Sequence, residues 1–258
     1  TTSGTQTYTG AVTLSADVVL TTTDSNATFG STIDSDDAST KRDLTLTLGS
    51  GSASVTGIVG ATSLADIILN SDTTFNNTLT ADNLTIAASK TGTVKDSVTI
   101  GSTITLNNSS VLAIENTTAI TIAGTIAEDS GSATGTKITI KFATADTAAN
   151  KVTISGTVTV DTLHVGDQSA ALFSGYADFT GSGGVTIGTI VVTSGNHANE
   201  YSTLQFNYAV TSSNGITIND KNDTAYQAYL IFAGNNTATI ASDIIVVDNE
   251  GTLKVTGT

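Results

Sequence analysis

The chain lacks four residue types altogether: none of its 258 residues is Cys, Pro, Met or Trp. The absence of cysteine is compatible with a secreted protein that avoids uncontrolled disulfide formation. Aromatic residues make up only 5% of the chain, so the 38% that is hydrophobic must build its core from Val, Ile, Leu and Ala. Such small, mostly β-branched side chains stack in thin layers and favour strands over helices.

Charged residues are also scarce, at 12% against about 25% in ordinary soluble domains. Thr, Ser, Asn and Gly supply the polar surface instead. Nine Lys and Arg residues oppose 23 Asp and Glu, which gives a net charge of −14. Such a chain repels nucleic acid and anionic lipid headgroups, and no apolar stretch approaches the ~18–20 residues that cross a bilayer. We therefore expect no nucleic-acid partner and no direct membrane insertion.

Short segments of alternating apolar and polar residues recur along the chain, separated by polar turns. Examples are AVTLSADVVL (11–20), DLTLTLGS (43–50), SVTIGSTITL (97–106) and KITIKF (137–142). A period of two is typical of β-strands with one buried face, and no segment shows helical spacing. Chains rich in Thr, Ser and Gly can be disordered, but the regular apolar content argues against disorder here.

The alternation also assigns residues to faces, because residues two apart in a strand point the same way. We expect Leu44, Leu46 and Leu48 to share a buried face, with Thr on the opposite one. The same reasoning predicts two more buried sets: Ile138, Ile140 and Phe142, and Val158, Val160, Leu163 and Val165.

Glycines separate pairs of short strands, where a backbone without Cβ can turn a corner. The unit of strand, Gly-Thr or Gly-Ser step, strand and acidic or Asn turn recurs at spacings of roughly 20–30 residues, the range of repeat architectures. The corner glycines are Gly101, Gly124, Gly156 and Gly188.

This repetition predicts an all-β fold: a right-handed parallel β-helix (β-solenoid), with one elongated solenoid over residues 1–258. We expect a subdivision near residue 150 and an irregular loop at 166–182, where the alternation breaks. The alternative is a Greek-key β-sandwich, which also has many short strands. The repeated unit, the few large aromatics and the Thr and Asn content, which suits stacked side-chain ladders, favour the solenoid.

Two segments resemble the repeats of large bacterial surface proteins. They are QTYTGAVTLSADVVLTTTDSNATFGSTIDS (6–35) and LTLTLGSGSASVTGIVGATSLADIIL (44–69). Similar units follow one another along the β-helical stalks of filamentous-haemagglutinin-like adhesins and autotransporter passengers. The resemblance covers about the first 90 residues well and marks architecture rather than chemistry. It implies secretion, a β-helix and a role at the cell surface.

The resemblance leaves two arrangements open: the chain is an excerpt of a giant protein, or it is a subunit that assembles. In either case we expect an extracellular structural protein, the building block of a fibre, sheath, surface layer or adhesin stalk. Its partners would be copies of itself or adjoining repeats, joined end to end. The alternative is an adhesin module that binds extracellular glycans.

An enzyme is the third function class, since β-helical lyases and hydrolases act on extracellular polysaccharides. Nucleophilic catalysis needs a base beside the nucleophile, and the only histidines are His164, on an expected strand, and His197, in an expected loop. Both are read as surface residues, so no catalytic residue and no enzymatic activity are predicted.

A platform of aromatic rings could stack on sugars. Inward packing is nevertheless the preferred interpretation of five aromatic residues in the carboxyl-terminal half: Tyr201, Phe206, Tyr208, Tyr226 and Tyr229.

Calcium is the one cofactor that the composition favours, because hard cations take several oxygen ligands and positive charges are few. The candidate ligands lie in two acidic turns, IDSDDAST and NDKNDT; they are Asp34, Asp36 and Asp37, and Asp220, Asn222 and Asp223. Neither turn matches an EF-hand loop or the nonapeptide of calcium β-rolls.

Overall fold

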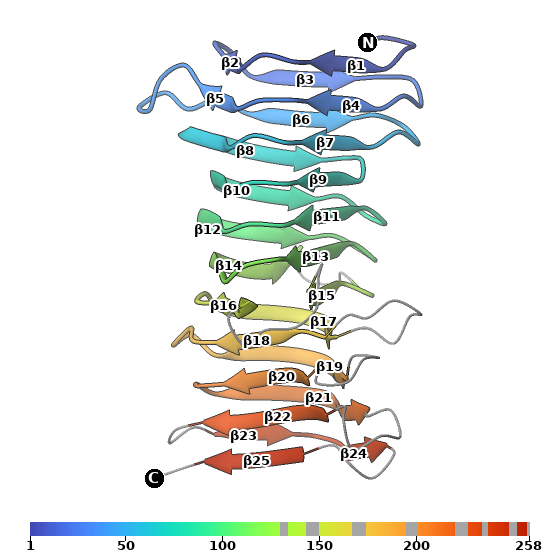
Figure 1. Ribbon diagram of the computed structural model, residues 1–258, viewed down its shortest axis with the longest axis vertical. Helices are drawn as coiled ribbons and strands as arrows, with labels where there is room; N and C mark the ends of the chain where they lie inside the picture. Colours follow the sequence, from blue (N-terminus) through green and yellow to red (C-terminus); the bar gives the residue numbers. More distant parts are fainter. Residues whose placement is uncertain are drawn as a thin grey trace. The chain divides into compact units, whose positions relative to one another are not determined.

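The strands of this protein pair in parallel with the strands of the next coil along the chain (Figure 1). The computed structural model describes residues 1–129, 134–142, 150–166, 174–194, 201–219, 227–233, 237–247 and 252–256. These residues form strands and connections, with no α-helix among them. The prediction of a parallel β-solenoid is thus confirmed, and the β-sandwich is excluded because its sheets are antiparallel.

The chain divides into two compact units. Unit 1 comprises residues 1–113 and 123–136, and unit 2 comprises residues 114–122 and 137–258. Two strands, β13 (Val111–Asn116) and β14 (Ile120–Glu128), contain residues of both units.

Unit 1 is built from short strands in three rows. Its strands are β1 (Gln6–Tyr8), β2 (Val12–Leu14), β3 (Val18–Thr21), β4 (Ala27–Phe29), β5 (Ile33–Ser35), β6 (Leu44–Thr47), β7 (Ala53–Val55), β8 (Val59–Leu69), β9 (Thr73–Phe75), β10 (Leu79–Ile86), β11 (Thr91–Val94) and β12 (Val98–Leu106). From β8 onward one long strand supplies both the second and the third row of its coil, since it pairs with β5 and with β6.

The register of unit 1 stacks like residues on like. On the inner face of the second row, Val12 pairs with Ile33, Ile33 with Val59 and Val59 with Leu79. On the outer face of the first row, Thr and Ser residues form a continuous ladder: Thr7, Thr28, Ser54, Thr74 and Thr93. The aliphatic core follows from this register, because each inward side chain packs against its counterparts in the neighbouring coils.

Unit 2 repeats the three rows with longer connections. Its strands are β15 (Lys137–Phe142), β16 (Val152–Ile154), β17 (Val158–Val165), β18 (Tyr176–Phe179), β19 (Val185–Thr193), β20 (Tyr201–Phe206), β21 (Val210–Asn219), β22 (Gln227–Ala233), β23 (Ala238–Ile240), β24 (Ile244–Val247) and β25 (Thr252–Thr256). One row runs through β16, β18, β20, β22 and β25. Aromatic rings stack along it, with ring centroids 5.1 Å apart for Phe179 and Phe206 and 5.9 Å apart for Phe206 and Phe232.

The predicted buried faces are confirmed. Leu44 is 2% exposed, and Leu46 and Leu48 are fully buried. Burial of one such side chain stabilises a fold by roughly 1.5–3 kcal/mol. The two sets of unit 2 are buried as well, namely Ile138, Ile140 and Phe142, and Val158, Val160, Leu163 and Val165.

The predicted glycine corners lie where one row passes into the next. Gly101, Gly124 and Gly188 stand within β12, β14 and β19, and Gly156 joins β16 to β17. A Cβ on Gly188 would lie 2.6 Å from the carbonyl oxygen of Asp161, so this corner has no room for a side chain. Within the expected irregular segment 166–182, the chain forms strand β18, while residues 167–173 lie outside the described residues.

Candidate functional site

Two of the predicted calcium ligands lie at and just after strand β5, where each carboxylate already has a protein partner. Asp34 accepts a hydrogen bond from the backbone N–H of Thr62 at 3.1 Å. Asp36 forms an ion pair with Arg42, whose Nε lies 2.7 Å from Oδ1. The hydrogen bond from Arg42 stabilises the ionised carboxylate and holds the pKa of Asp36 below its ordinary value.

The third predicted ligand in this turn, Asp37, stabilises the turn itself. Its Oδ1 accepts hydrogen bonds from the backbone N–H groups of Ser39 at 2.6 Å and Thr40 at 2.9 Å, which lower its pKa. Within the described ranges, no three His, Cys, Asp or Glu side chains form a group that could hold a metal. The second predicted turn lies outside those ranges, with Asp220, Asn222 and Asp223. Calcium binding therefore stays a prediction.

The histidines and aromatic residues named in the sequence analysis differ in their exposure in the structure. His164 lies on the outer face of β17, with Nε2 3.0 Å from Oγ1 of Thr193. Phe206 is 1% exposed and packs inward, whereas Tyr201 and Tyr208 are 38% and 42% exposed. Tyr229 pairs with Thr203 of the neighbouring strand, and its ring lies 6.1 Å from that of Tyr201 with the planes tilted by 49°. His197 and Tyr226 lie outside the described residues.

Acidic and amide side chains link the coils of unit 1 in a way that the sequence did not reveal. The Oδ1 of Asp24 accepts a hydrogen bond from the backbone N–H of Ser50, 26 residues later, at 2.8 Å. Similarly, Asp72 accepts from the N–H of Thr91, 19 residues later, at 2.8 Å. The Asp24 pKa is lowered by this backbone hydrogen bond.

A second series of such links runs through successive coils. Asp17 accepts from the N–H of Asp43 at 3.1 Å, and Asp43 accepts in turn from the N–H of Asp66 at 3.0 Å. We call these side chain to backbone links the corner ladder. In each of these links an earlier coil supplies the acceptor and the next coil the donor, so the acidic turns of unit 1 hold neighbouring coils in register.

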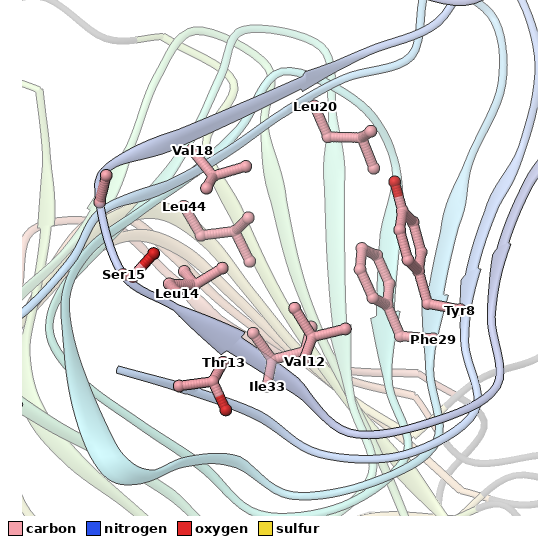
Figure 2. A pocket seen from close by; sticks show the side chains of 11 residues that line it. Tyr8, Val12, Thr13, Leu14, Ser15, Val18, Leu20, Phe29, Ile33 and Leu44 are labelled. Atoms are coloured by element: carbon pink, nitrogen blue, oxygen red, sulfur yellow. The ribbon is translucent and has the colours of Figure 1, made fainter. Parts of the chain in front are cut away.

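The inner face of the first coil of unit 1 is open. An apolar pocket of about 260 Å³ lies against it (Figure 2). Tyr8 and Phe29 stand side by side at one edge, with ring centroids 4.9 Å apart and planes at 10°. The remaining lining residues are Val12, Thr13, Leu14, Ser15, Ala16, Val18, Leu20, Ile33 and Leu44.

Burial differs sharply between this coil and the next. Val12 and Val18 are half-buried, whereas their register partners in the second coil, Ile33 and Leu44, are 0% and 2% exposed. Strands β1, β2 and β3 pair with β4, β5 and β6, and no other described strand pairs with them in register. The first coil therefore presents a ready-made apolar surface and a row of backbone groups to a further coil.

The last described coil of unit 2 exposes inward-facing residues as well. Val246 pairs with the fully buried Ile218, and Leu253 pairs with the fully buried Leu230. Val246 and Leu253 are nevertheless each 43% exposed. Each unit thus carries one coil whose core positions are covered on one side only.

These features define a class: a parallel β-solenoid. No protein-family model, curated protein or solved structure matches the chain. The resemblance to adhesin repeats in 6–35 and 44–69 therefore stays a prediction. Among the described residues, no helix is long and apolar enough to cross a membrane.

Proposed function

We propose that this chain is an extracellular structural protein, a β-solenoid building block of a cell-surface fibre, sheath, surface layer or adhesin stalk. Copies join end to end when the first coil of one copy receives the last coil of another. The proposal includes no catalytic activity. The observation that carries it is the open inner face of the first coil, lined by Tyr8, Val12, Val18 and Leu20.

The packing of the first coil on the second indicates what kind of partner fits the open face of the first coil. On its other side, the first coil packs on the second through parallel, in-register pairs such as Val18 with Leu44 and Leu20 with Leu46. A further coil of the same type would extend this packing and pair the free backbone edge, which otherwise recruits strands. The half-exposed Val246 and Leu253 supply apolar side chains of that type.

The extracellular location is supported by the residues rather than by any comparison. The chain contains no cysteine, and its surface relies on Thr, Ser and Asn. The repeats at 6–35 and 44–69 resemble those of bacterial surface proteins. An architecture whose stability comes from stacking one coil on the next suits a load-bearing element, because every added coil extends the same core.

The test is assembly of the purified chain, measured by negative-stain microscopy and sedimentation. We expect wild type to form end-to-end oligomers or filaments. Val18→Lys places a charge in the open face and should abolish assembly. Val19→Lys, one position along β3, is the matched control: Val19 is 66% exposed on the outer face, so this variant should assemble like wild type.

A complementary variant shows whether both ends take part. Leu253→Lys should block the other edge, and an equal mixture of Val18→Lys and Leu253→Lys chains should stop at dimers because one intact junction remains. Circular dichroism confirms that each variant folds. A wild type that stays monomeric at all concentrations, or equal assembly by the Val18 and Val19 variants, would overturn the proposal.

A further inference from the structure

A second pocket, on the outer face of unit 2, gathers cationic side chains in a strongly acidic chain. It has a volume of about 200 Å³ and lies between strands β15 and β17, lined by Lys137, Thr139, Lys141, His164 and Gly166. Every lining residue belongs to unit 2.

The strand register explains why these residues meet. Alternation along β15 buries Ile138 and Ile140 and turns Lys137, Thr139 and Lys141 outward. Thr139 pairs with His164, and the next pair, Ile140 with Val165, places Lys141 beside Gly166.

Gly166 keeps this part of the pocket open. Its backbone has φ +83°, a left-handed conformation that favours glycine. A Cβ at this position would collide with the carbonyl oxygen of Thr193 and with Oγ of Ser202. Residue 166 is therefore a glycine for a backbone reason, and it adds no side chain to the pocket lining.

The pocket retains positive charge. Lys141 forms an ion pair with Glu115, 3.2 Å away. Lys137, in contrast, makes no ion pair with any residue that the structure describes, unlike Lys41 and Lys151, which pair with Asp82 and Asp178. Among the described residues, one ammonium group at the pocket is thus not balanced by a carboxylate, in a chain whose net charge is −14.

From this geometry we infer that the pocket binds the carboxylate of an acidic sugar residue, a uronate. Ammonium groups bind oxyanions through charge-assisted hydrogen bonds, and the Thr139 hydroxyl can donate to or accept from a sugar hydroxyl. The site is small and local, while the acidic chain repels densely charged polymers such as nucleic acid. A saccharide whose carboxylates are isolated is small enough for the site and is not densely charged.

The inference is tested by NMR titration of the ¹⁵N-labelled full chain with glucuronate, glucose and inorganic phosphate. Glucuronate should shift the amide signals of Thr139 and Gly166 saturably, and glucose should not. Lys137→Gln and Lys141→Gln should each weaken glucuronate binding by about tenfold or more, since each removes a charged hydrogen-bond donor.

Lys95→Gln is the matched control, because it changes the net charge equally but lies on unit 1; it should bind glucuronate like wild type. Retained shifts in the two pocket variants would overturn the inference. So would binding of phosphate with no binding of glucuronate, which would reveal a general anion site, or the absence of any saturable shift. None of these results depends on end-to-end assembly, which Val18→Lys removes without touching the pocket.

Discussion

Units 1 and 2 have the same three rows of parallel strands but couple successive coils through different side chains. In unit 1 the corner ladder joins carboxylates to backbone N–H groups of the next coil, as between Asp24 and Ser50. In unit 2 three phenylalanine rings, Phe179, Phe206 and Phe232, follow one another along one inner row, whereas the ring pair described in unit 1 joins only its first two coils, through Tyr8 and Phe29. Most of the seven Phe and six Tyr residues lie beyond residue 140.

The difference shows that one backbone plan accepts two kinds of vertical coupling. A corner ladder acts at the surface and depends on the charge of its acceptors, whereas a ring stack acts in the core and depends on shape. Unit 2 also buries a carboxylate: Asp178 is 5% exposed and pairs with Lys151 at 2.9 Å. Unit 2, whose connections are longer, also has a hydrogen bond from the Phe142 N–H to the Ser174 carbonyl.

The largest expected effect comes from breaking the ring stack. Phe206→Ala should destabilise unit 2 by about 3–5 kcal/mol, through lost burial and the cavity left behind. Phe206→Leu keeps most of the volume, yet it loses two ring pairs worth about 0.5–1.5 kcal/mol each. The measurement is urea denaturation combined with hydrogen exchange of the β20 and β22 amides.

Phe75 provides the matched site in unit 1. It is also 1% exposed, but its register partners are Val55 and Val94 rather than rings. Phe75→Leu should therefore cost less than Phe206→Leu. Equal costs for the two leucine variants would mean that ring stacking adds nothing to burial and that the two units do not differ in this respect.

A smaller effect is expected at the glycine corners. Gly188→Ala should destabilise unit 2 by about 1–3 kcal/mol, because the added Cβ would overpack the carbonyl oxygen of Asp161 at 2.6 Å. At Gly101 of unit 1 the nearest atom to such a Cβ is 3.5 Å away. Gly101→Ala should stay within about 0.5 kcal/mol of wild type, as thermal unfolding of both variants would show. A Gly188→Ala variant as stable as wild type would contradict the claim that this corner has no room for a Cβ.

The smallest effect is local and depends on pH. The pKa of Asp24 is lowered in the fold by the hydrogen bond from Ser50, so the link contributes above the ordinary value of 3.8 and is lost as pH falls through the folded pKa. The Ser50 amide signal should move in that acid range. Asp24→Asn keeps an acceptor oxygen and should remove the titration, whereas an unchanged titration in this variant would assign it to another group.

Much of the core could be predicted from the sequence. Alternation in 43–50 and 137–142 fixed which residues face inward, because the side-chain period of a strand is two. The corner glycines and the spacing of the repeats predicted coils stacked in parallel. These are local signals, and a repeat fold turns local signals into long-range pairs, since each coil meets only its neighbours.

The corner ladder and the cationic pocket could not be predicted in the same way. Asp24 and Asp72 look like ordinary turn residues, and their partners are known only once the register is set. Alternation along β15 and β17 turns Lys137, Lys141 and His164 outward, but their meeting depends on the pairing of Thr139 with His164. The sequence predicts a metal site in the acidic turn around Asp36, and it could not indicate that these carboxylates contact Arg42 and backbone N–H groups of the turn.

The parallel register has a mechanical consequence for any polymer of this chain. A two-fold axis between copies would set facing strands in opposite directions, so two identical ends cannot extend the register. Joined copies would all point one way, giving the polymer two chemically distinct tips. Addition could then be faster at one tip than at the other, and a single cap at the preferred tip would govern its length.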